Sequence, residues 1–318
     1  MIHWDESGAG DALPLVARPD AYGTGPEVLT AWALENPGEW KPRLLRHGAL
    51  LFRGFGFDGF TPFEAFARGF SPDLLSYAGG ASNRKKVYGN VYTSTEASPR
   101  LVISQHHEGA YLPSMPSVIS FYCAQPAEKG GNTPLASGRK VTGRIPEALL
   151  DEYEQRRITY VNRLHGGLGA GRSWQAQFET QDPAAVERTL VEGGYEFEWL
   201  PGNTLRTRLT CDAVKRHPAT GERLWIGQAD HWHPSGLDPA VRAQLRQRMP
   251  ESEFPFNVFF GDGGALDESG LRLIREAIHA ETVRFPWEKG DVLVCDNLLV
   301  SHGRDPFEGE RKIYVALG

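Results

Sequence analysis

The sequence has few cysteines, no long hydrophobic run and no excess of basic residues. Its three cysteines, Cys123, Cys211 and Cys295, form no close-spaced pair, which predicts reduced thiols rather than a disulfide framework. No apolar run approaches the roughly 20 residues that span a bilayer. Residues 1–6 lack the basic and apolar segments of a signal peptide. We therefore predict a cytoplasmic protein that does not bind membranes.

The charge balance argues against a nucleic-acid partner. The formal net charge is −6 at pH 7, and the isoelectric point is about 6.0. Proteins that bind nucleic acids or anionic membranes normally carry a basic face. Local basic clusters such as Arg84-Lys85-Lys86 could contact a partner, but we favour a solvated surface. The sequence carries no signal for an oligomeric state.

The composition is typical of a globular protein, and the pattern of short segments predicts its class. Of the 318 residues, 40% are hydrophobic and 23% are charged. Apolar residues at helical spacing predict helices at 26–47 (interrupted near Pro37), 62–70, 145–157, 183–193, 237–249 and 267–281. Thr61 and Glu64 have the spacing of a capping box for the second of these helices. Apolar or Val-, Tyr- and Thr-rich runs predict strands at 49–52, 87–95, 117–123, 130–135, 158–161, 195–200, 282–285, 291–295 and 312–317. We predict a single α+β domain over 1–318, built on a β-barrel or jelly roll.

The stretch 105–111 contains the residues that are hardest to explain by packing. If it is extended, side chains alternate between faces, so His106 and Glu108 point the same way and His107 points the other way. A third donor would come from His302, which follows an apolar strand. Two histidines and one carboxylate on one side of an ion form the facial triad of non-haem Fe(II) oxygenases. Spacing alone leaves open that these histidines are ordinary core or surface residues.

A glycine-rich loop at 166–173 offers a different interpretation. It fits the phosphate-binding loop pattern except that Arg172 stands where lysine is required. No apolar strand ends in an aspartate suited to the magnesium ion of such a site. We therefore favour a surface loop or a mobile active-site lid near 162–180, with a phosphate-loop NTPase as the less favoured alternative.

Several motifs resemble one family. They are His106-His107-Glu108 and the segments 125–136, 285–291 and 296–307. Together they resemble the Fe(II)/2-oxoglutarate dioxygenases of the taurine dioxygenase (TauD/TfdA-like) family, in that family's order from about residue 48 to the C-terminus. The resemblance implies a double-stranded β-helix (a cupin-like jelly roll) with flanking helices and a long insertion between the strands that carry the metal ligands.

The resemblance also implies a set of site residues. His106, Glu108 and His302 would bind Fe(II), while Thr133 and Arg311 would hold the distal carboxylate of 2-oxoglutarate. The family often has two adjacent arginines where this chain has Arg311 and Lys312. Because strand alternation lets only one of them face the pocket, we choose Arg311 and keep Lys312 as the alternative.

Two residues that precede His302 in the sequence are also expected to support the metal site. Asp296 and Asn297 are expected to orient His302, with a simple turn as the alternative.

The implied reaction hydroxylates an unactivated C–H bond while 2-oxoglutarate and O2 become succinate and CO2. Glu108 retains the ligand that halogenating relatives lack, which favours hydroxylation over halogenation. Segments 198–208 and 302–304 resemble the branch of syringomycin-type amino-acid hydroxylases of natural-product pathways. We therefore predict an amino-acid substrate, either free or presented by a peptidyl-carrier protein.

Several alternatives remain open at this point. The same centre could desaturate or cyclise its substrate, or could oxygenate a small sulfonate or carboxylate in catabolism. The chain could also be a metal-binding module without catalysis. Three arginines are candidate partners for a substrate carboxylate, with structural ion pairs as the alternative: Arg206, Arg208 and Arg304.

Overall fold

The larger of two central sheets has eight strands. The computed structural model describes residues 2–6, 12–20, 23–76, 84–95, 97–112 and 114–318. In spatial order the large sheet consists of β1 (Ile2–Trp4), β2 (Leu15–Pro19), β3 (Ala49–Phe52), β17 (Val292–Asp296), β7 (Val118–Gln125), β20 (Lys312–Leu317), β5 (Val91–Thr93) and β4 (Lys86–Tyr88). Strand β3 is buried on both faces, as its continuous apolar run predicts.

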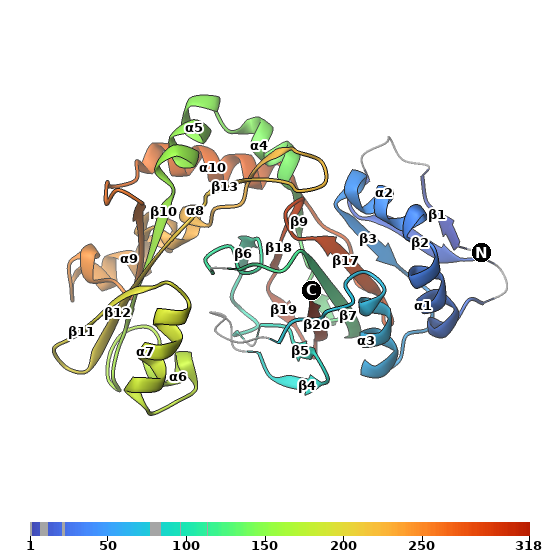
Figure 1. The fold of residues 1–318 in the computed structure, drawn as a ribbon, viewed down its shortest axis with the longest axis horizontal. Coiled ribbons are helices and arrows are strands. Elements are labelled where there is room, and N and C mark those ends of the chain that lie inside the picture. Colours follow the sequence, from blue (N-terminus) through green and yellow to red (C-terminus); the bar gives the residue numbers. More distant parts are fainter. Residues whose placement is uncertain (1, 7–11, 21–22, 77–83, 96, 113) are drawn as a thin grey trace.

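A second sheet of four strands shares an apolar core with the large one. Its order is β16 (Thr282–Val283), β9 (Leu135–Ser137), β18 (Val300–Arg304) and β6 (Ile103–His106). Leu135 and Val300 of this sheet belong to the same buried cluster as Leu51, Phe121 and Leu293 of the large sheet. The core therefore lies between the two sheets, in the centre of Figure 1.

Three N-terminal helices cover the other face of the large sheet (Figure 1). They are α1 (Pro26–Glu35), α2 (Pro37–His47) and α3 (Phe60–Arg68). Side chains alternate along β3, so Leu50 and Phe52 pack with these helices while Leu51 faces the smaller sheet. The interruption predicted near Pro37 is confirmed, since 26–47 forms two helices with the break at Asn36, directly before Pro37.

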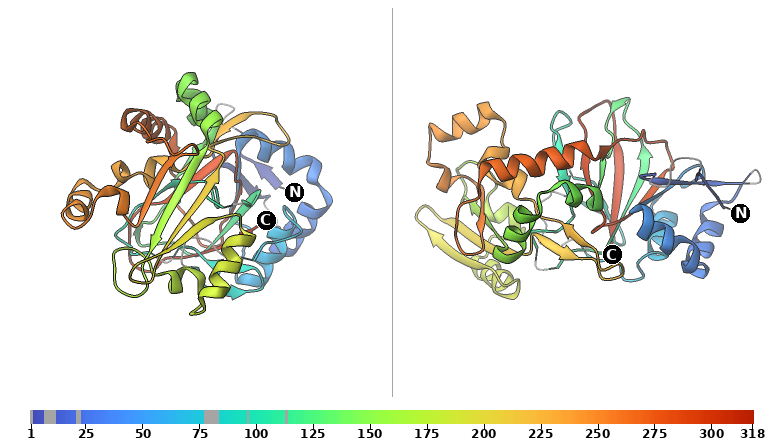
Figure 2. Two further views of the ribbon diagram at one scale, coloured as in Figure 1. Left: turned by 60° about the vertical axis from the view of Figure 1, so that its left-hand side comes forward. Right: turned by 90° about the horizontal axis from the view of Figure 1, so that it is seen from above.

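A long insertion separates β9 from β16 in the sequence, and hence β6 from β18. It contains a second four-stranded sheet, with the order β11 (Glu196–Leu200), β12 (Thr204–Cys211), β10 (Ile158–Leu164) and β15 (Phe256–Phe260). Its helices are α4 (Gly138–Arg144), α5 (Glu147–Arg156), α6 (Trp174–Phe178), α7 (Pro183–Glu192), α8 (Ala229–Trp232), α9 (Pro239–Arg246) and α10 (Glu268–Ala280). Figures 1 and 2 show this insertion as a separate body of strands and helices beside the central sheets.

The remaining short elements are two antiparallel pairs of strands and two 3-10 helices. The pairs are β13 (Val214–Arg216) with β14 (Arg223–Trp225), and β8 (Lys129–Gly130) with β19 (Phe307–Glu308). The 3-10 helices are η1 (Pro234–Gly236) and η2 (Glu251–Glu253). Within the described ranges, no helix combines the length and apolar character needed to cross a membrane. All three cysteines are buried and free, in agreement with the prediction of reduced thiols.

The capping box predicted at Thr61 is wrong. Helix α3 begins two residues before the predicted start, at Phe60, and its N-cap is Gly59, which has no side chain to offer. The Glu64 carboxylate instead pairs with Arg68 and accepts a hydrogen bond from the main-chain N–H of Asn90. The Glu64 carboxylate, which local spacing assigned to a capping box, therefore takes part in a tertiary contact instead.

A buried ion pair joins β3 to β17 and generates a stability prediction. Arg53 donates to both carboxylate oxygens of Asp291, with its Nε 3.0 Å from Oδ1 and its Nη2 2.7 Å from Oδ2. The exposed fractions of the two side chains are 9% and 1%. We expect Asp291→Asn to lower the free energy of unfolding by about 3 kcal/mol, because removing one partner of a buried pair leaves the other charge uncompensated. Urea denaturation measures this change.

The matched control is Glu308→Gln, which removes an ion pair with Lys129 whose side chains are 71% and 77% exposed. Its cost should be below about 1 kcal/mol, as is usual for surface pairs. Equal effects of the two substitutions would contradict the importance of the Arg53–Asp291 pair.

Candidate metal centre

Strand pairing brings the two predicted histidines together. Strands β6 and β18 are antiparallel neighbours, and His106 lies directly opposite His302, with ring centroids 4.3 Å apart. Glu108 Oε2 lies 4.0 Å from His106 Nε2 and 3.9 Å from His302 Nε2. The three donor atoms all lie within 4.8 Å of one another, so the group could hold a metal ion.

The strand alternation expected for 105–111 is only partly correct. Strand β6 ends at His106, and residues 108–111 form a turn. Glu108 therefore reaches the histidines from a turn rather than from the same strand face. The opposite orientation of His107 does hold, because its Nδ1 lies 2.6 Å from the main-chain oxygen of Asn297.

Both imidazoles suit a transition-metal ion. His106 Nδ1 lies 2.8 Å from the main-chain oxygen of Ser104, to which it can donate a hydrogen bond. The lone pair then lies on Nε2, the nitrogen on the Glu108 side, and is available to a metal ion. His302 Nδ1 is buried and has no hydrogen-bond partner among the described residues. Burial lowers the pKa of His106 and lowers that of His302 far below its usual value. The rings are therefore neutral at pH 7, as metal ligation requires.

The side chain of Asn297 fixes the backbone of Glu108. Its Oδ1 accepts from the Glu108 N–H at 2.8 Å, and its Nδ2 donates to the Glu108 carbonyl at 2.9 Å and to the Pro116 carbonyl at 2.8 Å. Asn297 is fully buried. The expectation that it orients His302 is therefore wrong, since it positions the carboxylate ligand instead.

Asp296 mainly stabilises a turn, which was the alternative to orienting His302. One of its carboxylate oxygens accepts from the main-chain N–H groups of Leu298 and Leu299. The other lies 3.0 Å from Nε2 of the buried His217. Asp296 therefore shapes the chain before β18 without contacting His302.

A hydrogen-bonded link joins the candidate metal site to the insertion, and no motif in the sequence indicated it. Gln228 Nε2 donates to the His107 carbonyl at 2.7 Å, and the Gln228 N–H donates to the hydroxyl of Tyr160 on β10. Trp232 Nε1 donates to Gln228 Oε1 at 3.3 Å. The turn that presents Glu108 is thus fixed from two sides, although Gln228 belongs to no motif.

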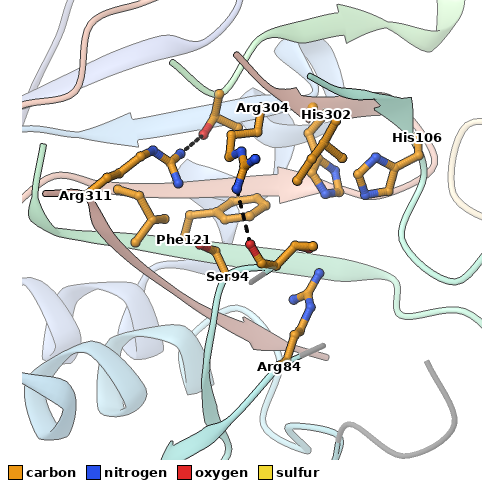
Figure 3. A pocket seen from close by; sticks show the side chains of 12 residues that line it. Arg84, Ser94, His106, Phe121, His302, Arg304 and Arg311 are labelled. Atoms are coloured by element: carbon orange, nitrogen blue, oxygen red, sulfur yellow. Dashed lines mark hydrogen bonds between the residues drawn. The ribbon is translucent and has the colours of Figure 1, made fainter. Parts of the chain in front are cut away.

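The other end of the same pocket is cationic. Arg311 donates to the carbonyl of Gly131 at 2.8 Å and to Oγ1 of Thr133 at 3.2 Å, and Thr133 also accepts from Trp287 Nε1 at 3.0 Å. Figure 3 shows Arg311 at one end of the pocket and His106 and His302 at the other. Burial, aided by nearby Arg304, lowers the pKa of Arg311 to about 10, which leaves it charged at pH 7.

Lys312 does not share this position. Its side chain is 50% exposed and pairs with Glu310.

Gly131 adopts a φ of 68°, and a Cβ there would lie 2.9 Å from Ala127 Cβ and 3.0 Å from Arg311 Cδ. Glycine therefore allows Arg311 to pack closely against the loop that carries Thr133.

The three arginines proposed for a substrate carboxylate have structural partners. Arg206 and Arg208 on β12 both pair with Glu198 on the neighbouring strand β11. Arg304 donates to the main-chain carbonyls of Thr95, Ala97, Ser98 and Leu101. The alternative of a structural ion pair therefore holds for Arg206 and Arg208, while Arg304 has backbone partners instead.

The burial of Arg84 differs most from what we predicted from the sequence. Its side chain is only 3% exposed, and its Nη2 lies 2.5 Å from Oε2 of Glu108. The interpretation of residue 84 as part of a solvated surface is therefore wrong. A run of basic residues gives no sign that one member is buried, because the partner lies 24 residues further along the chain.

The glycine-rich loop leads into α6, a helix of five residues whose N-cap is Ser173. Arg172, which stands in the place of the lysine of a phosphate loop, donates to Gln177 Oε1 and to the carbonyl of Ala176. Parts of the loop line a cavity of about 270 Å³, together with Asn162, Gln177, His231, Trp232 and Phe256. These contacts give no support to a nucleotide site.

The fold and the cluster of two histidines and a glutamate define the class of an iron-dependent oxygenase. The sequence matches the family described as "Taurine catabolism dioxygenase TauD, TfdA family" over residues 21–317. The chain therefore belongs to the TauD/TfdA family of dioxygenases. This confirms the predicted enzyme class and, with it, the predicted dependence on iron and 2-oxoglutarate.

Two relatives share most of the chain. The dapdiamide synthesis protein DdaC of Enterobacter agglomerans is 37% identical over 274 residues, which cover 86% of this chain and 83% of DdaC. The clavaminate synthase-like protein At3g21360 of Arabidopsis thaliana is 29% identical over 282 residues, which cover 85% of this chain and 81% of that protein.

Solved structures share the fold at lower identity. PvcB from Pseudomonas aeruginosa has a TM-score of 0.54 and 18% identity, over 100% of this chain and 90% of PvcB. A putative alpha-ketoglutarate-dependent taurine dioxygenase from Burkholderia xenovorans has a TM-score of 0.56 and 17% identity, over 100% of this chain and 92% of that one.

The Asn297–Glu108 contacts generate a prediction about metal affinity. We expect Asn297→Ala to weaken Fe(II) binding by about 10- to 100-fold, the usual effect of losing a residue that orients a ligand. Anaerobic calorimetric titration with Fe(II) measures it. The control is Asn36→Ala, which removes a hydrogen bond to the Trp32 carbonyl in the N-terminal helices. Unchanged affinity in Asn297→Ala would contradict the role of Asn297.

Proposed function

We propose that His106, Glu108 and His302 bind Fe(II), and that Thr133 and Arg311 hold the distal carboxylate of 2-oxoglutarate. The observation that carries this proposal is that one pocket has three metal donors at one end and a buried, charged Arg311 at the other. A dicarboxylate suits this arrangement, because one end can reach the metal while the other pairs with the guanidinium.

His106, Glu108 and His302 would hold the iron, which would supply the oxidising power for converting 2-oxoglutarate and O2 to succinate and CO2 with hydroxylation of a C–H bond of the substrate. The chain contributes orientation and exclusion of water. Thr133 and Arg311 fix the distal carboxylate, the neutral imidazoles donate electron pairs, and Asn297 keeps Glu108 in place. Glu108 keeps the third ligand position filled, which favours hydroxylation over halogenation.

The proposed substrate is an amino acid or an amino-acid derivative in a natural-product pathway. The 37% identical relative is named for dapdiamide synthesis, and a PvcB structure is described as an oxygenase from an isonitrile synthetic pathway. The 270 Å³ cavity supports this class, because it combines the amide side chains of Asn162 and Gln177 with the aromatic rings of Trp232 and Phe256. The substrate is free or is presented by a peptidyl-carrier protein. Desaturation or cyclisation by the same centre, and catabolic oxygenation of a sulfonate or carboxylate, are the alternatives.

The proposal extends to the organisation of the chain. Residues 1–318 form one cytoplasmic domain, its two central sheets make a double-stranded β-helix, and the segment 162–180 acts as a lid. The shared core between the sheets supports the β-helix. Five residues of the segment line the 270 Å³ cavity and support the lid: Asn162, Leu164, Gly171, Arg172 and Gln177.

Anaerobic titration of the Fe(II)-loaded protein with 2-oxoglutarate tests the cofactor assignment. We expect the weak visible metal-to-ligand charge-transfer band to form in the wild type and to be absent in His106→Ala. Arg311→Ala should need at least about tenfold more 2-oxoglutarate, because it loses a charge-assisted pair with the distal carboxylate.

The matched control is Lys312→Ala, since that side chain pairs with Glu310 outside the pocket and its loss should leave the titration unchanged. A folded, iron-loaded wild type without the band would refute the proposed function. A large effect of Lys312→Ala with none of Arg311→Ala would move the carboxylate site to Lys312.

Succinate formation tests the substrate class. We expect the rate to rise above its basal value with an amino acid, either free or attached to a carrier protein, and to stay basal with taurine. Phe256→Ala should raise the KM for the active compound by about tenfold and leave the 2-oxoglutarate band intact, because it removes aromatic packing in the cavity but no contact in the other pocket. Stimulation by taurine alone would favour the catabolic alternative.

A further inference from the structure

A second, smaller cavity adjoins the 270 Å³ cavity. It has a volume of about 50 Å³, and four residues line both cavities: Asn162, Leu164, Gln177 and Trp232. Side-chain alternation along β10 and β12, which are neighbours in the sheet of the insertion (Figure 1), completes one wall, since Leu209 lies opposite Tyr160 and Thr207 opposite Asn162. The smaller cavity can therefore hold one end of a molecule whose remainder lies in the larger cavity.

Aromatic side chains form much of the wall of the smaller cavity. Five of its ten lining residues are aromatic: Tyr111, Tyr160, Phe178, Tyr195 and Trp232. The ring centroid of Trp232 lies 5.0 Å from that of Tyr160 and 5.5 Å from that of Tyr111. Burial raises the pKa of Tyr195 to about 12, so its phenol is neutral at pH 7. Aromatic faces carry partial negative charge and attract cations, most strongly where water is excluded.

A buried carboxylate lies near these rings. The side chain of Asp230, on the same short helix as Trp232, is 9% exposed, and its Oδ1 has no hydrogen-bond partner among the described residues. Arg275 donates to the main-chain carbonyl of Asp230 rather than to the carboxylate, and His231 Nδ1 lies 3.4 Å from Oδ1. Burial and, among smaller causes, the negative charge of Asp230 raise the pKa of Tyr160. The field of this carboxylate therefore reaches the wall of the cavity.

The composition of the wall favours a cation with N–H groups. All ten described residues that line the smaller cavity are uncharged, whereas Arg172 and His231 line the larger one only. A cation would therefore meet no like charge in the wall, and the buried carboxylate would attract it strongly at low dielectric. Asn162 and Thr207 add oxygen atoms that can accept hydrogen bonds from an N–H group. An uncharged tail would use the rings but not the carboxylate.

The size of the smaller cavity restricts the cation further. About 50 Å³ has room for roughly four water-sized groups. This matches a short alkylammonium group. Such an amine is protonated at pH 7, because its pKa is close to that of a lysine side chain, about 10.4.

We propose that the smaller cavity binds an alkylammonium group of the substrate, while the rest of the substrate occupies the larger cavity. This inference rests on the proposed function. It narrows the substrate class to amino acids, or their derivatives, that carry a free aliphatic amine at one end.

The test compares two probes of equal size, n-propylammonium and propan-1-ol, by ligand-observed NMR titration of the full-length protein. The wild type should bind n-propylammonium at least about tenfold more tightly. Asp230→Asn keeps the shape of the side chain and removes its charge, so it should weaken n-propylammonium binding by about tenfold and leave propan-1-ol binding unchanged. Equal affinity of the wild type for the two probes would overturn the ammonium site.

Two further variants guard against indirect effects. Asp262→Asn removes a carboxylate of the insertion that is 54% exposed and pairs with Arg156, and it should change neither affinity. Tyr195→Leu replaces a ring of the wall by an aliphatic side chain and should weaken only n-propylammonium binding, by about fivefold. Equal losses in Asp230→Asn and Asp262→Asn would show non-specific attraction and overturn the site. Unfolding midpoints show that affinities are compared between folded proteins.

Titration with 2-oxoglutarate separates this inference from the proposed function, since the pocket of His106 and Arg311 shares no lining residue with the smaller cavity. Asp230→Asn should form the charge-transfer band as readily as the wild type. A wild type that forms no band refutes the proposed function and, with it, the substrate role of the smaller cavity. A normal band together with equal affinity for the two probes overturns only the ammonium site.

Discussion

The paired hydrogen bonds between the Asn297 side chain and the Glu108 main chain are the constraint on which the site depends. They join the end of β17 to the turn after β6, across 189 residues of sequence. Without this join, the turn that carries Glu108 would be held on one side only, by the hydrogen bond from Gln228 to the His107 carbonyl. Because both partners are buried, each unmade hydrogen bond would also carry the full cost of desolvation.

Strand register supplies the rest of the geometry. Antiparallel pairing of β6 and β18 sets His106 opposite His302, so that the imidazoles meet without help from local sequence. The apolar core packs this pairing against the large sheet, and the buried Arg53–Asp291 pair joins β3 to β17 within that large sheet. The site is therefore built on paired strands, and only Glu108 comes from a turn.

The insertion and the central sheets share one network of contacts. Gln228 connects the carbonyl of His107 to the hydroxyl of Tyr160, which lies on the sheet of the insertion. Trp232 belongs both to this network and to the wall of the 270 Å³ cavity. A molecule bound in that cavity would therefore contact a residue only two hydrogen bonds from the turn that presents Glu108.

The sequence by itself determined the family and the main candidates, because motifs such as His106-His107-Glu108 preserve chemistry in short segments. It also determined local elements whose pattern is strong, such as the buried strand β3 and the amphipathic helix α10. Only the tertiary structure decided that Arg84 is buried against Glu108, that Asn297 holds Glu108 rather than His302, and that Arg304 binds backbone carbonyls. These facts depend on contacts between distant segments, and a charged or amide side chain carries no local signal of the partner it will find.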